Sequence, residues 1–257
     1  MNVLVCVKAV PSTGSVQVDG AFRLQRDGAK LEWNVSDLSA LEAALSLKGP
    51  EGRVTVLTMG PKKLEEPLRE LFARGVDEAL LLTDPAFAGA DTFATANALE
   101  TAVKNHGPFD LILCGRRAID GETGQVPSML AAALALPCIT GAERITPEGS
   151  GLLVRRPVEE GVQMLFVPMP AVISLCEYTY SLRLPGIMGL RRAKGKAVTL
   201  LSPAELGIDK ENLGLSGSLT RVIQMDSKFP GLRKGPKTDS LSQGIPAILS
   251  VIKEAKG

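Results

Sequence analysis

The stretch LILCGRRAIDGETGQVPSML, residues 111–130, contains the features that decide how this chain folds. It begins with an unbroken apolar run, residues 111–114, which is typical of a strand buried on both faces. A polar loop rich in small residues follows, and beyond Thr123 the apolar residues return at helical spacing. The stretch therefore predicts a strand, then a loop, then a helix that ends near Ala135.

The loop between this strand and helix has the chemistry of an anion site. Free backbone N–H groups and the positive end of the helix dipole favour a phosphate at such a junction. The glycines let a ligand approach the backbone closely, and Arg116 can add a charge-assisted hydrogen bond to an oxyanion. An ordinary strand-to-helix turn explains the loop equally well, so the rest of the chain has to decide between the two.

Asp120 and Glu122 in the same loop resemble a general acid/base pair. No partner base and no metal-binding cluster accompanies them in the sequence, and short acidic side chains commonly form turns. We therefore expect capping and turn formation from them, and we expect no catalytic residue.

The composition limits what the chain can be. Its 257 residues, 45% of them hydrophobic, suffice for one large α/β domain and exclude wholesale disorder. A net charge of +1 argues against a general binder of nucleic acid or of membrane surfaces. No apolar run is long enough to cross a bilayer, and the N-terminal MNVLVCVKAV favours a strand over a signal peptide. We expect a cytoplasmic protein.

The four cysteines, Cys6, Cys114, Cys138 and Cys176, stand far apart in apolar contexts. This favours buried, reduced thiols over a zinc site or a disulfide framework. The single histidine, His106, excludes a multi-histidine metal site and disfavours a Ser-His-Asp triad. We expect no metal site.

Strand-like and helix-like segments alternate through the first half of the chain. This alternation predicts a doubly wound parallel sheet, an α/β fold with helices on both faces. Ser36 or Asp37, and Asp91 or Thr92, can cap two of the helices. The expected strands are 2–9, 53–58, 79–83 and 111–114, and the expected helices end near residues 48, 75, 106 and 135.

Small and polar residues follow each predicted strand, in the segments 8–11, 58–61, 88–92 and 115–126. Ligands of such sheets bind at the carboxyl ends of the strands, near the point where the strand order reverses. We therefore expect these segments to converge on one site. The chain lacks both a G-x-G-x-x-G after its first strand and a Walker A lysine, so the standard dinucleotide and P-loop sites are excluded.

The remaining segments predict extensions of this fold. Asp19-Gly20 indicates a hairpin, and the pattern after Pro137 predicts antiparallel strands near 142–145, 152–156 and 162–166, then a buried strand at 171–176. From Tyr178 the chain has the character of an extended arm, with a strand-like 220–225 and a closing helix at 239–256. We expect an α/β domain with its antiparallel hairpin extension at 1–180, and a C-terminal arm at 181–257 that rests on another subunit or hangs as a tail.

Several segments, taken in order, resemble one family. They are LVCVKAVP at 4–11, Asn34 and Asp37 with LEAALSLK at 41–48, TMGP at 58–61, AFAGADT at 86–92 and GRRAIDGETGQV at 115–126. Together they resemble the beta subunit of electron-transfer flavoproteins, from the N-terminus to about Gly207. The resemblance implies an adenine-nucleotide-binding fold and a heterodimer with an alpha subunit that holds FAD and is embraced by the C-terminal arm.

Two branches of that family differ in the ligand of the beta subunit. In the electron-shuttling branch, which serves acyl-CoA dehydrogenases, the ligand is AMP. In the electron-bifurcating branch it is a second FAD, with NADH as electron donor and with ferredoxin and a dehydrogenase of acyl-CoA or hydroxy-acid type as partners. TMGP, AGADT and AIDGET resemble the bifurcating branch more closely. A nucleotide-sensing regulatory module that forms a homodimer is the alternative of another class.

The resemblance also implies site residues. The adenosine would be framed by Cys6, Lys8, Ala9, Asn34 and Asp37, with Met59 and Gly60 passing close to the nucleotide. The extra half of an FAD would face Ala88, Ala90, Asp91 and Thr92. The phosphates would be wrapped by Gly115, Arg116, Asp120, Gly121, Thr123, Gly124, Gln125 and Val126. Leu184, Ile187 and Met188, with the basic Arg191 and Arg192, resemble the loop that docks partner dehydrogenases.

Overall fold

The computed structural model describes residues 1–12, 17–18, 24–25, 30–223 and 240–254. Contacts between residues divide the chain into two units, Met1–Arg221 and Val222–Gly257. The second unit contains α8 (Leu241–Glu254), which confirms the predicted closing helix. Its described side chains include the exposed Ile245, Ile248, Leu249 and Ile252.

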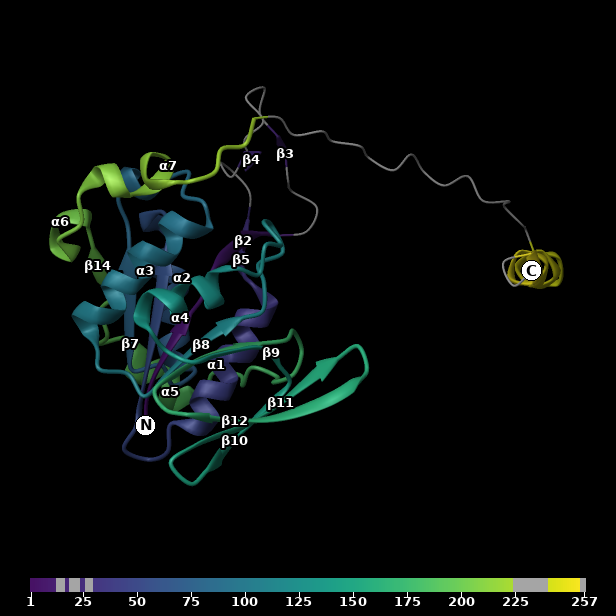
Figure 1. The fold of residues 1–257 in the computed structure, drawn as a ribbon, viewed down its shortest axis with the longest axis horizontal. Helices are drawn as coiled ribbons and strands as arrows, with labels where there is room; N and C mark the ends of the chain where they lie inside the picture. The colour runs from purple at the N-terminus through teal and green to yellow at the C-terminus, as the bar shows by residue number, and fades with distance from the viewer. Residues whose placement is uncertain (13–16, 19–23, 26–29, 224–239, 255–257) are drawn as a thin grey trace. The chain divides into compact units, whose positions relative to one another are not determined.

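The first unit is built on a seven-stranded parallel sheet, as the alternation of strands and helices predicts (Figure 1). The strand order is β14-β7-β6-β1-β8-β13-β9. In chain order the strands are β1 (Asn2–Cys6), β6 (Arg53–Met59), β7 (Glu78–Leu82), β8 (Leu111–Gly115), β9 (Cys138–Ala142), β13 (Ala171–Leu175) and β14 (Thr199–Leu201).

The strand order reverses between β1 and β8. From β1 the chain proceeds outward to β6 and then β7, and it returns to form β8 on the other side of β1. In an open α/β sheet such a reversal leaves a crevice at the carboxyl ends of the two strands, where ligands bind. The topology therefore directs attention to the residues that follow Cys6 and Gly115.

Two layers of helices cover the sheet. Helices α1 (Val35–Leu47) and α2 (Glu65–Ala73) pack on one face, and α3 (Thr92–His106) and α4 (Val126–Leu134) pack on the other. Side chains alternate between the faces along each strand, so that Val3 and Val5 join the first core and Leu4 the second. Because both faces are buried, the strands are predominantly apolar, with a few buried hydroxyl residues such as Thr55, Thr58 and Ser174.

A three-stranded antiparallel sheet confirms the predicted hairpin extension. It comprises β10 (Arg144–Glu148), β11 (Gly151–Val158) and β12 (Gly161–Pro168). One face contributes Ile145, Val154 and Val167 to the core, whereas on the other face three β12 side chains are exposed. These are Val162, Met164 and Phe166.

Two small antiparallel pairs lie near the N-terminus. β3 (Gln17–Val18) pairs with β4 (Leu24–Gln25), which confirms the predicted hairpin, although its turn at 19–20 lies outside the described residues. β2 (Ala9–Pro11) pairs with β5 (Leu31–Trp33). The predicted single strand 2–9 is therefore wrong in detail, because β1 ends at Cys6 and a separate strand begins at Ala9.

The two predicted helix caps differ in outcome. Asp91 caps α3 as predicted, since its Oδ1 accepts a hydrogen bond from the Ala94 N–H at 2.9 Å. The prediction that Ser36 or Asp37 caps α1 is wrong: α1 begins at Val35 after Asn34, which places both residues inside its first turn.

The remaining elements are short. They are the 3-10 turns η1 (Lys62–Leu64), η2 (Pro85–Phe87) and η3 (Lys210–Asn212), and the helices α5 (Ile187–Ala193), α6 (Pro203–Leu206) and α7 (Gly214–Gly217). The strand-like 220–225 is not a strand over its described residues 220–223. Among the described residues, no helix combines the length and the apolar character that crossing a membrane requires.

Candidate functional site

Loops from four strands meet around the crevice between β1 and β8. Asn34, which precedes α1, forms hydrogen bonds with groups on both sides of this crevice. Its backbone N–H donates to the Lys8 carbonyl at 2.9 Å, and its side-chain Nδ2 donates to the Arg117 carbonyl at 2.9 Å. The Ile119 N–H donates to Asn34 Oδ1 at 3.3 Å. The buried Asn34 therefore holds the segment after β1 and the loop after β8 in a fixed relation.

Asp37 connects the same elements from the first turn of α1. Its Oδ2 accepts the Lys8 N–H at 2.7 Å, and its Oδ1 accepts from Asn34 Nδ2 at 3.0 Å. Burial raises the pKa of the Asp37 carboxyl to about 7, and this effect outweighs the opposing hydrogen bonds from Asn34, Lys8 and Gly115. The carboxyl group is thus a buried junction of three chain segments.

Gly115 allows α1 to approach the end of β8. A Cβ atom at this position would lie 2.0 Å from Asp37 Oδ1 and 2.3 Å from Ser36 Oγ, far inside van der Waals contact. Only glycine permits this approach. The first glycine of the loop therefore serves the packing of α1 against β8.

An ion pair spans the crevice itself. Lys8 Nζ lies 2.7 Å from Asp120 Oδ1, with the Lys8 side chain 43% exposed and that of Asp120 only 5% exposed. Lys8 follows β1 and Asp120 follows β8, so the pair joins the two sides of the switch point. Both residues belong to the set that the resemblance implies.

The loop then leads into the N-terminus of α4. Backbone φ is positive at Glu122 (49°) and at Gly124 (62°), and α4 begins after Gln125 without a side-chain cap. Thr92 Oγ1 donates to Gln125 Oε1 at 3.1 Å, which brings the start of α3 beside the start of α4. The uncapped helix end presents its N–H groups and positive dipole to an anion.

A polar hollow of about 270 Å³ lies on the α4 side of this loop. Arg116 is oriented within the fold, since its Nη2 donates to Glu177 Oε1 at 2.7 Å. Arg117 adds a second guanidinium to the lining, and such groups can form charge-assisted hydrogen bonds with an oxyanion. It is lined by Arg116, Arg117, Glu122, Thr123, Gly124, Ser128, Thr140 and Gly141.

The loop before α3 is bound to a segment far along the chain. Asp91 Oδ2 accepts hydrogen bonds from both the N–H and the hydroxyl of Thr220, at 2.8 and 2.9 Å. The Asp91 N–H donates to Ser218 Oγ at 2.8 Å, and the Leu215 N–H donates to the Ala88 carbonyl at 3.1 Å. Residues 213–220 therefore lie across the loop 86–91 and are hydrogen-bonded to it.

The other implied ligand residues lie at the same edge of the sheet. Cys6 is the last residue of β1, Ala9 begins β2 and Val126 begins α4. Met59 ends β6, and the Gly60 N–H donates to the Leu82 carbonyl at 3.0 Å. Gly121 has open space around it, and Ala90 precedes the Asp91 cap. Contact of these residues with a ligand stays a prediction.

The implied docking residues form a separate surface on α5 and the segment before it. Leu184, Ile187 and Met188 are 86%, 79% and 64% exposed, and Arg191 and Arg192 are exposed beside them. The segment is nevertheless anchored: Arg183 forms a two-nitrogen hydrogen bond with Glu42, and the Arg74 guanidinium donates to the Arg183 carbonyl at 2.6 Å. Apolar side chains are thus presented to solvent on a fixed base.

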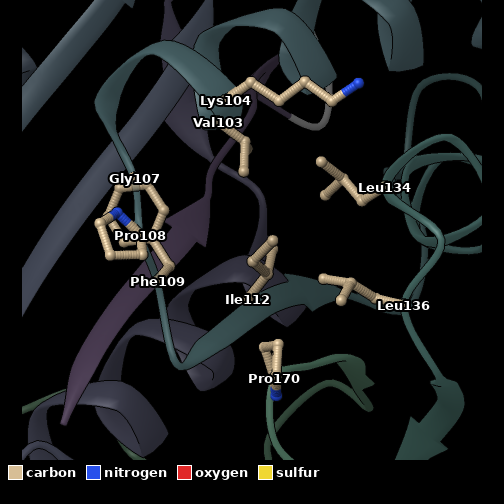
Figure 2. A pocket seen from close by; sticks show the side chains of 9 residues that line it. All are labelled: Val103, Lys104, Gly107, Pro108, Phe109, Ile112, Leu134, Leu136 and Pro170. Carbon is tan, nitrogen blue, oxygen red and sulfur yellow. The ribbon is translucent and has the colours of Figure 1, made fainter.

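The larger hollow, of about 470 Å³, lies elsewhere (Figure 2). It is lined mainly by apolar side chains at the end of α3, the end of α4 and the amino ends of β8 and β13, including Val103, Phe109, Ile112, Leu134 and Leu136. This is the edge of the sheet opposite to the crevice. Neither its position nor its lining suits a phosphate-bearing ligand, so we assign the site to the carboxyl edge.

Sequence reasoning missed several residues of this framework. Ser36 Oγ donates to the Arg117 carbonyl at 2.9 Å, Glu177 pairs with Arg116, and Ser218 and Thr220 hold Asp91. The proximity of Ser36 to Asn34 and Asp37 was a usable signal. Nothing local to Ser218 or Thr220 indicates that they lie against a loop more than a hundred residues earlier.

Comparisons with known proteins identify relatives of this chain. A family described as electron transfer flavoprotein domain matches residues 22–206. The electron transfer flavoprotein subunit beta of Thermoanaerobacterium thermosaccharolyticum is 42% identical over 226 residues, covering 87% of this chain and 86% of that protein. The caffeyl-CoA reductase-Etf complex subunit CarD of Acetobacterium woodii is 38% identical, covering 87% of each chain. The subunit beta of Mycobacterium tuberculosis is 34% identical, covering 99% of this chain and 98% of that protein.

Proposed function

The chain belongs to the electron transfer flavoprotein family as a beta subunit, and from this premise we propose that it binds FAD at the carboxyl edge of its sheet and takes part in electron bifurcation from NADH. Beta subunits of this family pair with an alpha subunit and act with dehydrogenases. In the proposed reaction ferredoxin and a partner dehydrogenase, of acyl-CoA or hydroxy-acid type, receive the electrons.

The observation that carries the proposal is the uncapped N-terminus of α4 behind the loop 115–125. Its free N–H groups, the positive φ values in the loop and the two arginines of the adjoining hollow together suit a pyrophosphate. In our proposal Thr123, Gly124 and Gln125 donate to the phosphates at the helix start. Lys8, on the β1 side of the crevice, would help to frame the adenosine, and Asp120, on the β8 side, would lie in the loop that wraps the phosphates.

The loop before α3 favours FAD over AMP in this proposal. Thr92, the first residue of α3, directly follows this loop and is hydrogen-bonded to Gln125. The loop therefore adjoins the proposed phosphate site. A ligand that continues beyond its phosphates can reach this loop, whereas AMP ends at the phosphate. The TMGP and AGADT segments, which resemble the bifurcating branch, belong to the same edge of the sheet.

The protein's own residues would bind and orient the ligand. FAD, when bound, would supply the electron-transfer chemistry between NADH and the acceptors. Asn34 and Asp37 hold the loop after β8 in place, and Gly115 allows that packing. None of these residues needs to act as an acid or base in the proposed role.

The exposed surface on α5 would dock the partner dehydrogenase. Large exposed apolar side chains beside arginines are typical of a protein-binding patch. The relative CarD is named as a subunit of a caffeyl-CoA reductase-Etf complex, which supports an acyl-CoA type of partner for this chain. Leu184, Ile187 and Met188 would supply the apolar contact, and Arg191 and Arg192 the charged rim.

The test is a cofactor count on the chain purified with its alpha subunit. Flavin and AMP are released by denaturation and quantified by chromatography. Two FAD per heterodimer and no AMP are expected, followed by NADH-driven reduction of ferredoxin once the partner dehydrogenase and its oxidised substrate are supplied as the second electron acceptor. One FAD with stoichiometric AMP would identify an AMP-binding electron shuttle that serves acyl-CoA dehydrogenases, and would overturn the proposal. Two FAD without ferredoxin reduction would retain the ligand and refute bifurcation.

A further inference from the structure

Two of the four cysteines lie opposite each other on neighbouring strands. The register of β1 and β8 pairs Val5 with Leu113, and one step further along both strands sets Cys6 opposite Cys114. Both side chains point to the same face of the sheet, toward the core under α3 and α4. The fold therefore brings together two cysteines that lie more than a hundred residues apart in the sequence.

The two thiols lie close enough to influence each other. The neighbouring Cys6 side chain raises the pKa of the Cys114 thiol, with Cys114 buried and Cys6 partly exposed at the end of β1. Neighbouring strands lie about 4.8 Å apart, which falls within the Cα separation of roughly 4.4–6.8 Å that a disulfide spans. The strand spacing therefore meets the Cα requirement for a disulfide.

The other two cysteines do not share this arrangement. The Cys138 thiol lies 4.0 Å from the Pro127 carbonyl oxygen, and the Cys176 thiol donates to the Gly141 carbonyl at 3.4 Å. Each is engaged with backbone on the β9 side of the sheet. They serve as internal controls for any difference in reactivity.

We propose that Cys6 and Cys114 form an oxidisable dithiol pair at the crevice, which a peroxide converts to a disulfide. In the first step the Cys6 sulfur attacks a peroxide oxygen, the O–O bond breaks, and one water leaves as Cys6 becomes a sulfenic acid. In the second step the Cys114 sulfur attacks the Cys6 sulfur, the S–O bond breaks, and a second water leaves. Two thiols lose one hydrogen each, and hydrogen peroxide is reduced to two waters.

The surroundings assign the order of these steps. Cys6 is the more accessible thiol, so the peroxide meets it first. The Cys6 side chain and burial raise the pKa of the Cys114 thiol, and the nearby Asp37 and Cys138 act in the same direction. A protonated, enclosed thiol is a poor nucleophile toward peroxide, so Cys114 reacts second. Oxidation of Cys6 removes the thiol that raises the pKa of Cys114, and Cys114 can then act as the resolving partner.

The experiment treats the full chain, purified with its alpha subunit, with increasing hydrogen peroxide. Remaining thiols are alkylated under denaturing conditions, and the peptides are mapped by mass spectrometry. The expected result is the loss of two alkylatable thiols of the four, a linked Cys6–Cys114 peptide pair two hydrogens lighter, and recovery of both thiols with dithiothreitol. Cys138, which is exposed, and Cys176 form no linked peptide at the same peroxide concentration, because neither lies opposite another cysteine on a neighbouring strand.

Two variants sharpen the result. In Cys6→Ala the linked pair disappears and Cys114 stays alkylatable, whereas Cys138→Ala retains the linkage. Wild-type protein alone also decides the matter, because the mass of the linked Cys6–Cys114 peptide pair identifies the disulfide without a variant. Conversion of Cys6 to sulfinic acid while Cys114 remains a free thiol would overturn the proposal, as would a linkage of Cys6 to Cys138.

Discussion

Lys8 Nζ and Asp120 Oδ1 lie 2.7 Å apart and join the two sides of the switch point between β1 and β8. The Asp120 side chain is 5% exposed, so its carboxylate depends on protein partners for solvation. This ion pair connects the loop after β1 with the loop after β8. Its removal should therefore affect both stability and ligand binding.

We expect Lys8→Met to lower the free energy of unfolding by about 1–2 kcal/mol, less than for a fully buried pair because Lys8 is partly exposed. Lys30→Met is the matched control, since the Lys30–Glu32 pair is 3.7 Å apart and exposed on both sides. That variant should change stability by less than about 0.5 kcal/mol. Urea unfolding of both chains measures the difference, and equal midpoints would refute a structural role for the Lys8 pair.

Asp37 should make stability fall as pH rises toward neutral. Its pKa is about 7 in the folded protein against an ordinary 3.8, so between these values the folded state holds more protons than the unfolded state. The contribution of Asp37 to the free energy of unfolding is complete below pH 3.8 and is lost as the pH rises through about 7. It amounts to at most on the order of 4 kcal/mol.

The non-titrating Asp37→Asn should flatten this slope while destabilising the protein at acidic pH. Asp77→Asn is the contrasting control. Partial burial raises the pKa of Asp77, but hydrogen bonds from Lys48 and the Val54 N–H lower it overall, so its contribution is lost as pH falls. Denaturant midpoints measured across the acid-to-neutral range separate the two signs. An unchanged slope in Asp37→Asn would show that Asp37 does not titrate in this window.

Gly115→Ala should destabilise the protein and weaken nucleotide binding together. The new Cβ would meet Asp37 Oδ1 at 2.0 Å, so α1 and β8 must separate, at a cost of about 1–3 kcal/mol or more. Gly121→Ala, in the same loop, has no atom within 4 Å of the new Cβ and should be tolerated. Thermal unfolding and retained FAD or AMP are measured for both, and similar losses in the two variants would contradict the packing argument.

Ile187→Ala with Met188→Ala should leave the fold unaffected and impair partner docking. Both side chains are largely exposed, so stability should change by less than about 0.5 kcal/mol. Electron transfer to the partner dehydrogenase should fall at least several-fold, through a higher KM for the dehydrogenase. Val162→Ala, an exposed apolar residue of β12, serves as the control. Full activity of the double variant would refute the docking role of α5.

The sequence predicts the centre of the sheet well because each central strand is a continuous apolar run. β9 and β14 escaped prediction for identifiable reasons. The sequence of β9, CITGA, includes a glycine and has no continuous apolar run. In the structure Gly141 has φ 72° and the pairing with β13 is irregular. β14 has three residues and depends on pairing with β7, a contact between segments far apart in sequence.

The site could be located from sequence but its internal bonding could not. The polar segments after each strand do meet at one edge, because parallel strands place their carboxyl ends together. The role of Asn34 as a junction depends on the Arg117 carbonyl and the Ile119 N–H, backbone groups that any residue type could supply. The amino-acid sequence therefore does not indicate that these two backbone groups are the hydrogen-bond partners of Asn34.

The anchoring of α5 has an evolutionary consequence. Its attachment uses Gly189 against Ala73, Lys196 on the Val76 and Asp77 carbonyls, and Arg183 on Glu42, whereas its outward residues take no part in holding it. The proposed docking surface can thus diversify by substitution at 184, 187 and 188 alone, while the base and the proposed nucleotide edge stay under separate selection. One scaffold of this kind can acquire new redox clients by exchanging a segment shorter than ten residues.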